Sequence, residues 1–234
     1  MKKRKMVQML APVYGLVMIF ALIVAHLGSR AVTVMVESAP IDGRRILVVD
    51  AGHGGIDGGA TSCTGVLESG INLEIALRLN DLLRLLGHET LMVRTTDTSI
   101  HIQGNTIATQ KVSDLKQRVA LVNGLDQALL VSIHQNTYPD GRYSGAQVFY
   151  AADDVSKALA DRMQSDFRDT LNIGSKRQSK PAAGIFLMQN IRHSGVLIEC
   201  GFLSNALEEE LLRQGSYQKK LCCIIAAAIS RTLT

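Results

Sequence analysis

Two histidines and two glutamates stand in four short motifs that together predict a zinc site. The motifs are Ala51-Gly52-His53-Gly54-Gly55, Leu67-Glu68, Ser132-Ile133-His134-Gln135-Asn136 and Leu197-Ile198-Glu199-Cys200-Gly201. Two imidazoles and one carboxylate can hold Zn²⁺ while a coordination position stays open for water. A further carboxylate beside that water can act as its base. No motif is specific alone, but together they predict a catalytic metal centre.

The elements around these motifs place all four side chains at one edge of a sheet. Three of them follow short apolar runs typical of buried strands: His53 after 46–49, His134 after 129–133 and Glu199 at the end of 196–199. Glu68 opens a helix that is expected to cross back over the sheet. Because sites in open α/β sheets form beyond the carboxyl ends of the strands, we expect the four side chains to converge.

The remaining pattern predicts a single α/β domain whose central, mostly parallel sheet is flanked by helices. Further strands are expected at residues 90–93, 146–150 and 185–188, and helices at 68–86, 114–123, 156–171, 207–214 and 217–232. Ser113 is expected to cap the second helix, which makes residues 95–111 a long polar loop. The first strand-helix-strand unit implies a parallel pair of strands.

Each motif also has a competing interpretation. The glycines around His53 allow a sharp turn and could form a phosphate cradle. That motif fails Gly-x-Gly-x-x-Gly, because Asp57 stands where the last glycine belongs, and it lacks the Gly-Lys-Ser/Thr ending of a P-loop. A lone histidine near a strand end is more often a structural residue. A lone Glu68 at a helix start is explained by its favourable interaction with the helix dipole. Glu199 is harder to explain this way, since an unpaired carboxylate ending an apolar run is costly unless a cation lies nearby.

The N-terminal residues predict a membrane segment. Residues 6–26 contain no Lys, Arg, Asp or Glu. A spanning helix needs about 20 consecutive residues of this uncharged, mostly apolar kind. Four basic residues at 2–5 should stay cytoplasmic, which predicts a membrane-anchored protein with its catalytic domain outside the cytoplasm. An uncleaved anchor is favoured over a removed signal peptide, because no convincing small-x-small cleavage site follows. The expected division is an anchor or signal segment at 1–30, a linker at 31–44 and a catalytic domain at 45–234.

Composition excludes several other classes of protein. Hydrophobic residues make up 47% of the chain, which excludes general disorder. Residues 2–5 carry four of the 25 Lys and Arg residues and leave 21 basic against 21 acidic residues, so the charge does not predict binding to nucleic acid. The absence of Trp argues against a separate carbohydrate-binding module. The cysteines form no Cys-x-x-Cys pair, and a disulfide from Cys63 to another cysteine stays open.

The motifs resemble those of the zinc-dependent N-acetylmuramoyl-L-alanine amidases of the Amidase_3 type, over nearly everything from Ile46 onward. Members carry Gly-His-Gly-Gly, a Glu before the first helix, Ser-Ile-His-x-Asn and Glu-x-Gly-Phe-Leu-Ser-Asn. Those motifs stand here at residues 52–55, 68, 132–136 and 199–205. The resemblance implies a peptidoglycan substrate, His53, Glu68 and His134 as zinc ligands, and Glu199 as the catalytic carboxylate.

A narrower resemblance is to the germination-specific amidases of spore cortex maturation. It rests on residues 144–150 and 184–190, on the polar loop before Ser113, and on the single domain with its anchor. In that subfamily, removal of the stem peptide from muramic acid precedes formation of muramic-δ-lactam by a separate deacetylase and cyclising enzyme. A general autolysin for cell separation is the alternative within the same class.

The chain departs from the usual family pattern at three places, none of which removes a ligand. Ala51 stands where the family usually has Pro, Ser69-Gly70 replace Lys-Asp, and Cys200 replaces an aliphatic residue. Gly70 is expected to weaken the start of the helix that carries Glu68.

Other roles stay open at this point. Asn136 and Asn72 are candidate substrate contacts or partners that orient a metal ligand, and a structural role is as well supported for both. Two other functions compete with the amidase: a zinc carboxypeptidase acting on the end of the stem peptide, and a non-catalytic wall-binding protein. An accessory protein that holds the zinc in place is a further open possibility.

Overall fold

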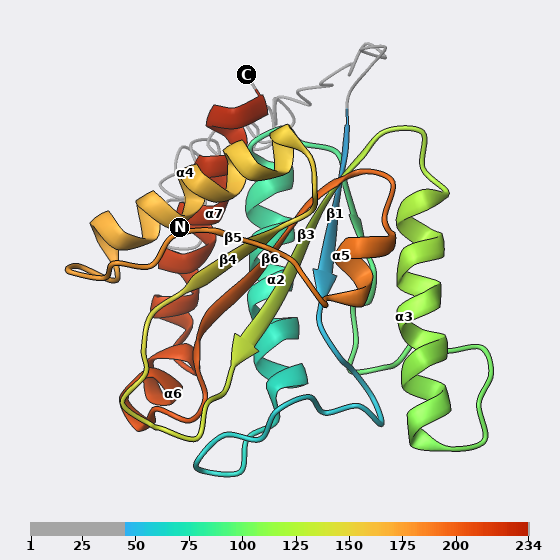
Figure 1. The fold of residues 1–234 in the computed structure, drawn as a ribbon, viewed down its shortest axis with the longest axis horizontal. Coiled ribbons are helices and arrows are strands. Elements are labelled where there is room, and N and C mark those ends of the chain that lie inside the picture. Colours follow the sequence, from blue (N-terminus) through green and yellow to red (C-terminus); the bar gives the residue numbers. More distant parts are fainter. Residues whose placement is uncertain (1–44, 234) are drawn as a thin grey trace, which may run out of the picture. The chain divides into compact units, whose positions relative to one another are not determined.

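A computed structural model describes residues 45–233 of the chain (Figure 1). Its single sheet has six strands in the order β2-β1-β3-β6-β4-β5. The strands are β1 (Ile46–Ala51), β2 (Thr90–Met92), β3 (Ala128–Asn136), β4 (Gln147–Tyr150), β5 (Lys180–Pro181) and β6 (Ser194–Phe202). Strands β2, β1, β3 and β6 are mutually parallel, whereas β4 runs antiparallel to β6 and parallel to β5. The sheet is therefore mixed, with the parallel part carrying the predicted site.

Helices cover both faces of the sheet. They are α2 (Glu68–Leu85), α3 (Ile107–Asn123), α4 (Asp154–Thr170), α5 (Phe186–Asn190), α6 (Ala206–Leu212) and α7 (Gly215–Leu233). Alternate strand residues face opposite layers, as the twofold side-chain period of a strand requires. Leu47, Val131 and Ile198 pack with α2, α4 and α7, whereas Val48 and Leu130 pack on the face that α3 and α5 cover.

The face under α3 changes from apolar to polar toward the carboxyl ends of the strands. Along β3 the side chains on this face run from the buried Leu130 and Ser132 to the partly exposed His134. Glu199 occupies the position next to His134 on β6, because the two residues are paired in register. On this face the polar side chains thus lie at the carboxyl ends of the strands, next to the connecting loops.

Two predicted elements are corrected by the structure. Residues 185–188 were expected to form a strand, but α5 occupies 186–190 and the neighbouring strand is the short β5. A run of four apolar residues does not distinguish a strand from a buried helical turn. Helix α3 begins at Ile107 instead of Asp114, because a capping box between Thr106 and Thr109 starts it earlier. Ser113 lies inside this helix, where its hydroxyl accepts hydrogen bonds from two N–H groups of the preceding loop.

The predicted membrane-anchored location is also corrected. None of the helices in residues 45–233 is long and apolar enough to cross a membrane. The stretch that led to the prediction, residues 6–26, lies outside the described residues.

All four cysteines lie among the described residues, and all are free thiols.

Candidate metal centre

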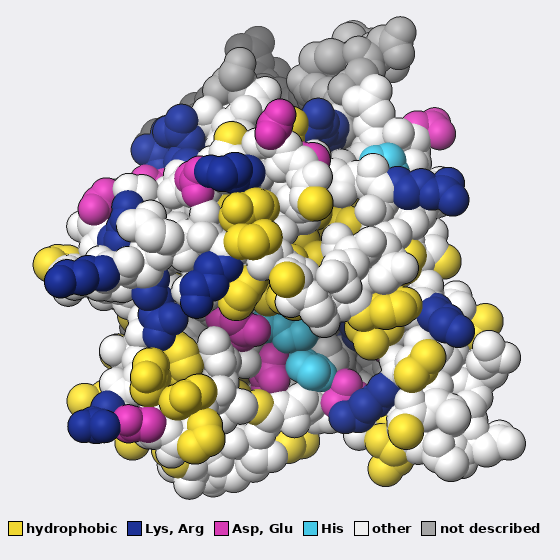
Figure 2. Space-filling model, in the orientation of Figure 1, with side chains coloured by type: hydrophobic (Ala, Val, Ile, Leu, Met, Phe, Trp, Pro, Cys, Tyr) yellow, Lys and Arg dark blue, Asp and Glu magenta, His cyan; other side chains and the backbone are white. Residues whose placement is uncertain are grey.

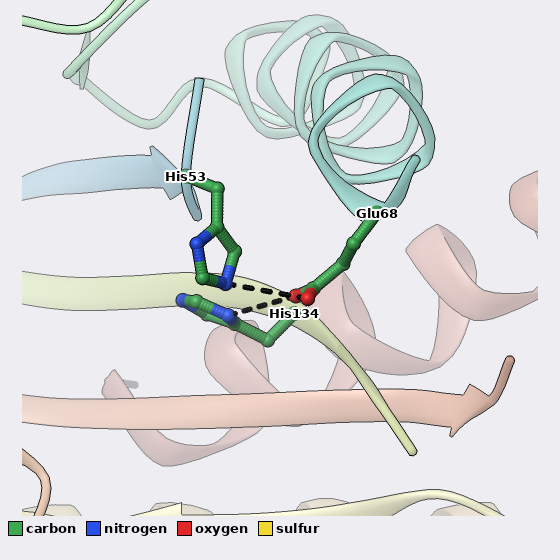
Figure 3. Close-up of side chains that lie close together, drawn as sticks. All are labelled: His53, Glu68 and His134. Carbon is green, nitrogen blue, oxygen red and sulfur yellow. Dashed lines mark hydrogen bonds and ion pairs between the residues drawn. The ribbon is translucent and has the colours of Figure 1, made fainter. Parts of the chain in front are cut away.

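Three side chains that are distant in the sequence meet at the carboxyl edge of the sheet (Figure 3). His53 follows β1, Glu68 is the first residue of α2, and His134 lies near the end of β3. One ligand atom from each lies within 4.8 Å of the other two. His53 Nε2 is 3.3 Å from Glu68 Oε2, and His134 Nδ1 is 3.0 Å from Glu68 Oε1. The structure therefore brings together the three residues that the motifs predict to be metal ligands.

Figure 2 shows histidine and acidic side chains gathered in a hollow of the molecular surface. The side chains of His53 and His134 keep 26% and 18% of their surface exposed, whereas Glu68 keeps 4%. Solvent and a ligand can thus reach the imidazoles, while the carboxylate beneath them is buried.

Several donors hold the Glu68 carboxylate in one orientation. Its Oε2 accepts a hydrogen bond from the Ala60 N–H at 2.9 Å. Its Oε1 accepts from the Asn72 side chain at 3.0 Å and from the Gln135 N–H at 3.1 Å, beside the register shift in β3. Burial acts to raise the pKa of Glu68, but its interactions with the two histidines outweigh burial and lower that pKa. Glu68 is consequently ionised at neutral pH, as a metal ligand must be.

His53 is held in an unusual backbone conformation and by a second carboxylate. Its φ of 62° lies in the left-handed region that residues other than glycine rarely adopt. Its Nδ1 lies 2.8 Å from Oδ2 of Asp57, and the other oxygen of Asp57 lies 2.7 Å from Lys111 Nζ of α3. This arrangement points Nε2 of His53 toward Glu68. Burial acts to lower the pKa of His53, but Glu68 and Asp57 outweigh it and raise that pKa to about 9.

Two glycines leave the space that the site side chains occupy. A Cβ atom on Gly52 would lie 2.2 Å from the His134 ring, and one on Gly59 would lie 2.5 Å from Glu68 Oε2. Because real Cβ atoms do not approach other atoms so closely, both positions require glycine for packing, independently of the turn that the motif makes.

Glu199 lies beside the cluster, paired with His134 across β3 and β6. Its Oε2 is buried and has no hydrogen-bond partner among the described residues. Burial and the charge of Glu68 raise the pKa of Glu199 to about 7, against the opposing effect of the two histidines. An orphaned buried carboxylate oxygen is costly unless a group outside the chain satisfies it.

The residues present fit a divalent metal. Two imidazole nitrogens and a carboxylate oxygen form a donor set that zinc favours, and three protein ligands leave room for a water or substrate oxygen. The orphaned oxygen of Glu199 supplies a hydrogen-bond acceptor for such a molecule. The cluster could therefore hold a metal at the carboxyl edge of the sheet.

A buried ion-pair network supports the loop from the side of α3. Arg118 pairs with both Asp50 and Asp114, and it donates to the carbonyl of His53 at 2.7 Å. Asp50 also accepts a hydrogen bond from the Ser132 hydroxyl at 2.6 Å. Sequence reasoning missed this network. Asp50 carried a usable signal, because it ends a buried apolar run as Glu199 does.

The sequence also does not identify Asp57 and Lys111 as site residues. For Lys111 the reason is that a helix expected to begin at Asp114 leaves it in a loop.

The two asparagines named from the sequence lie in different surroundings. Asn72 is fully buried, and its amide donates to the Gly52 carbonyl and to Glu68, so it contacts the candidate ligand Glu68 instead of solvent. Asn136 is partly exposed at the end of β3.

The fold and the residue set together suit a metal-dependent hydrolase with its centre at the carboxyl edge of an α/β sheet. The chain belongs to the Amidase_3 family, N-acetylmuramoyl-L-alanine amidase, whose model matches residues 47–231. The family resemblance expected from the motifs is thereby confirmed, and the protein is an enzyme of this amidase type.

Individual relatives share most of the chain. This chain is 38% identical over 203 residues to the germination-specific N-acetylmuramoyl-L-alanine amidase of Bacillus subtilis. The match covers 84% of this chain and 83% of the relative. The CwlD amidase from Clostridioides difficile, solved in complex with the GerS lipoprotein, superposes with a TM-score of 0.77 at 34% identity and covers 81% of this chain and 98% of its own. An N-acetylmuramoyl-L-alanine amidase from Clostridium difficile 630 gives a TM-score of 0.70 at 29% identity, covering 81% and 97%.

Proposed function

We propose that His53, Glu68 and His134 bind Zn²⁺ and that Glu199 is the catalytic base for hydrolysis of the amide between N-acetylmuramic acid and L-alanine in peptidoglycan. The observation that carries this proposal is the orphaned, buried oxygen of Glu199 beside the three ligand side chains. In this proposal residues 45–234 form the catalytic domain. Zinc, when bound there, would polarise the lactyl carbonyl and make a water more acidic.

The chain's own residues then account for the proton transfers. Glu199 takes a proton from the attacking water on its free oxygen and delivers it to the leaving amine of L-alanine. A base works best when its pKa is close to the working pH, and in the metal-free protein burial raises the pKa of Glu199 to about 7. The lowered pKa of Glu68 keeps this carboxylate ionised, so it does not take up the proton. Asp57 keeps His53 oriented.

The test compares Glu199→Gln and His134→Ala on purified peptidoglycan. E199Q should keep zinc and lose about 10²–10⁴ in rate. H134A should lose both zinc and activity. Glu210→Gln is the matched control, because Glu210 is an exposed carboxylate on α6. Near-normal turnover by E199Q would overturn the role of Glu199.

Mass spectrometry of the products identifies the bond. Stem peptides with a free L-alanine amino terminus, matched by glycan strands without peptide, are expected. Release of single residues from the end of the stem peptide would show a carboxypeptidase instead, and no product from zinc-loaded protein would favour a wall-binding role.

The biological setting that we propose is spore cortex maturation, supported by the similarity to the germination-specific amidase of Bacillus subtilis. Deletion of the gene in a sporulating host should abolish muramic-δ-lactam in the cortex. A deletion strain with normal lactam and chained cells would favour the autolysin alternative. The similarity to a CwlD amidase solved with a lipoprotein supports an accessory protein as partner, which co-purification from sporulating cells would detect.

A further inference from the structure

Arg94 is a buried arginine just after β2 that donates only to backbone carbonyls. Its side chain has no exposed surface. Nε donates to the Ala51 carbonyl at 2.8 Å, and Nη1 donates to the Thr96 carbonyl at 3.0 Å. Nη2 donates to the carbonyls of Gly52 at 2.9 Å and Ser69 at 2.8 Å. A single guanidinium thus ties three separate chain segments together.

The two carbonyls that share Nη2 belong to the neighbours of two candidate metal ligands. Gly52 directly precedes His53, and Ser69 directly follows Glu68. The two segments are the turn after β1 and the start of α2, and they are separated in the sequence. The bridge through Nη2 therefore links the backbone next to His53 to the backbone next to Glu68.

Ion pairing does not explain why this guanidinium is buried. Arg118, the other buried arginine of the region, has two close carboxylates in Asp50 and Asp114. The one carboxylate paired with Arg94 among residues 45–233 is that of Asp97, at 3.9 Å and with 55% of its side chain exposed. A buried charge without a close counter-ion is costly. The carbonyl bonds are the interactions that offset this cost.

We propose that Arg94 is a positioning residue that sets the spacing of His53 and Glu68 and so tunes the affinity of the site for zinc. The inference rests on the proposed metal role of those two residues. Asn72 makes a weaker link of the same kind, because its amide reaches the Gly52 carbonyl at 3.2 Å and Glu68 Oε1 at 3.0 Å. Arg94 adds the connection to the Ser69 backbone, where the start of α2 contains Gly70 and has no side-chain cap.

Arginine is required for this geometry because its donors have a fixed planar arrangement. Lysine carries the same charge as three donors on a flexible stem, without the rigid fork. Arg94→Lys should preserve the charge yet lose the simultaneous bonds to Ala51, Gly52 and Ser69. Outer partners that orient metal ligands are typically worth about 10–100-fold in metal affinity.

The experiment measures the zinc affinity of the full-length chain by competition with a chelator, together with the melting temperature of the zinc-free and zinc-saturated protein. R94K should bind zinc about 10–100-fold more weakly than wild type and gain less in melting temperature on zinc saturation. The matched control is Arg168→Lys, since Arg168 donates to the Arg177 carbonyl and a hydroxyl of α4, away from the site. R168K should keep wild-type zinc affinity.

The outcomes separate this inference from the proposed function. If wild-type protein binds zinc tightly and H134A does not, the metal site stands, and an unchanged zinc affinity in R94K overturns only the role of Arg94. An equal drop in both melting temperatures with unchanged affinity would show a merely structural arginine. If wild-type protein does not bind zinc, the proposed function itself fails.

A second measurement applies if R94K does not fold. In wild-type protein labelled with ¹⁵N-arginine, the Nη protons of Arg94 should exchange slowly with solvent. Zinc should slow that exchange further, because binding locks the two bridged segments together. Exchange that is fast, or unaffected by zinc, would overturn the inference.

Discussion

Oδ2 of Asp57 lies 2.8 Å from Nδ1 of His53, and this contact determines which nitrogen of the ring faces the candidate metal centre. A carboxylate that accepts a hydrogen bond from Nδ1–H keeps the proton on that nitrogen and leaves Nε2 to supply its lone pair to a metal, which is the usual arrangement of a histidine that binds one. Lys111 and the N–H of Gly59 hold the other oxygen of Asp57. The turn after β1 is therefore organised around one carboxylate as well as around its glycines.

Asp57→Asn should weaken zinc binding by about 10–100-fold without unfolding the protein. An amide can present its NH₂ group to the ring and so loses the preference for one tautomer. Zinc affinity by chelator competition measures the effect. Lys111→Met should weaken binding less than D57N, because the Lys111 side chain is about half exposed and only supports Asp57 from its other oxygen. Equal affinities for D57N and wild type would contradict the orienting role.

Zinc binding should release protons at pH 7, about one of them from His53, because the pKa of His53 is raised to about 9 in the metal-free protein and a histidine must give up a ring proton to bind a metal. Below pH 9 zinc competes with a proton on His53, so its apparent affinity should rise about tenfold per pH unit from 7 to 9. Calorimetry in two buffers with different ionisation enthalpies counts the protons. Heats that do not depend on the buffer would contradict the prediction.

The site was predictable where one side chain and its nearest neighbours carry the signal. His53, Glu68 and His134 each stand directly beside a strand or helix whose pattern is local, so topology alone places them at one edge. Asp57, Lys111 and Arg94 act through contacts between segments far apart in the sequence, and no local pattern records those contacts. Lys111 was further hidden because the cap of α3 is a Thr106–Thr109 pair instead of the expected Ser113.

The fold shows the same division between local and long-range information. The strands of the parallel part were predicted because continuous apolar runs leave few alternatives. The short run at 185–188 is helical because Leu187 and Met188 pack on the face of the sheet already covered by α3, which no count of apolar residues reveals. The direction of β4 likewise depends on its pairing with β6.

Asp50→Asn should destabilise the protein and remove part of its sensitivity to acid. Asp50 is fully buried; burial acts to raise its pKa, but Arg118 and Ser132 lower it below the ordinary value of 3.8. A group whose pKa is lower in the folded state contributes stability above its unfolded pKa and loses that contribution as pH falls through its folded pKa. Removing one partner of a buried pair costs about 3–5 kcal/mol when the other charge is left unpaired, and D50N should lose less than that because Arg118 keeps Asp114.

Urea unfolding of the zinc-free protein between pH 3 and 7 measures both effects. Wild type should lose free energy of unfolding below about pH 4, where the unfolded carboxyl takes up a proton first. D50N should start lower and show a flatter dependence in that range. Asp140→Asn is the control, since Asp140 forms an ion pair with the exposed Arg142. Parallel curves for D50N and wild type would contradict the assignment.

Gly52→Ala and Gly70→Ala should have opposite consequences. Neither glycine has a positive φ, so the added methyl group is the main difference. At Gly52 it would lie 2.2 Å from the His134 ring and displace that ring, so G52A should lose zinc binding and activity. At Gly70 the added methyl group would meet no atom within 4 Å apart from its chain neighbours and the backbone of its own helix, and alanine should stabilise α2 by about 0.5–1 kcal/mol. G70A should therefore raise the melting temperature and keep full zinc affinity. A loss of zinc in G70A would mean that a flexible start of α2 is needed for Glu68 to reach the metal.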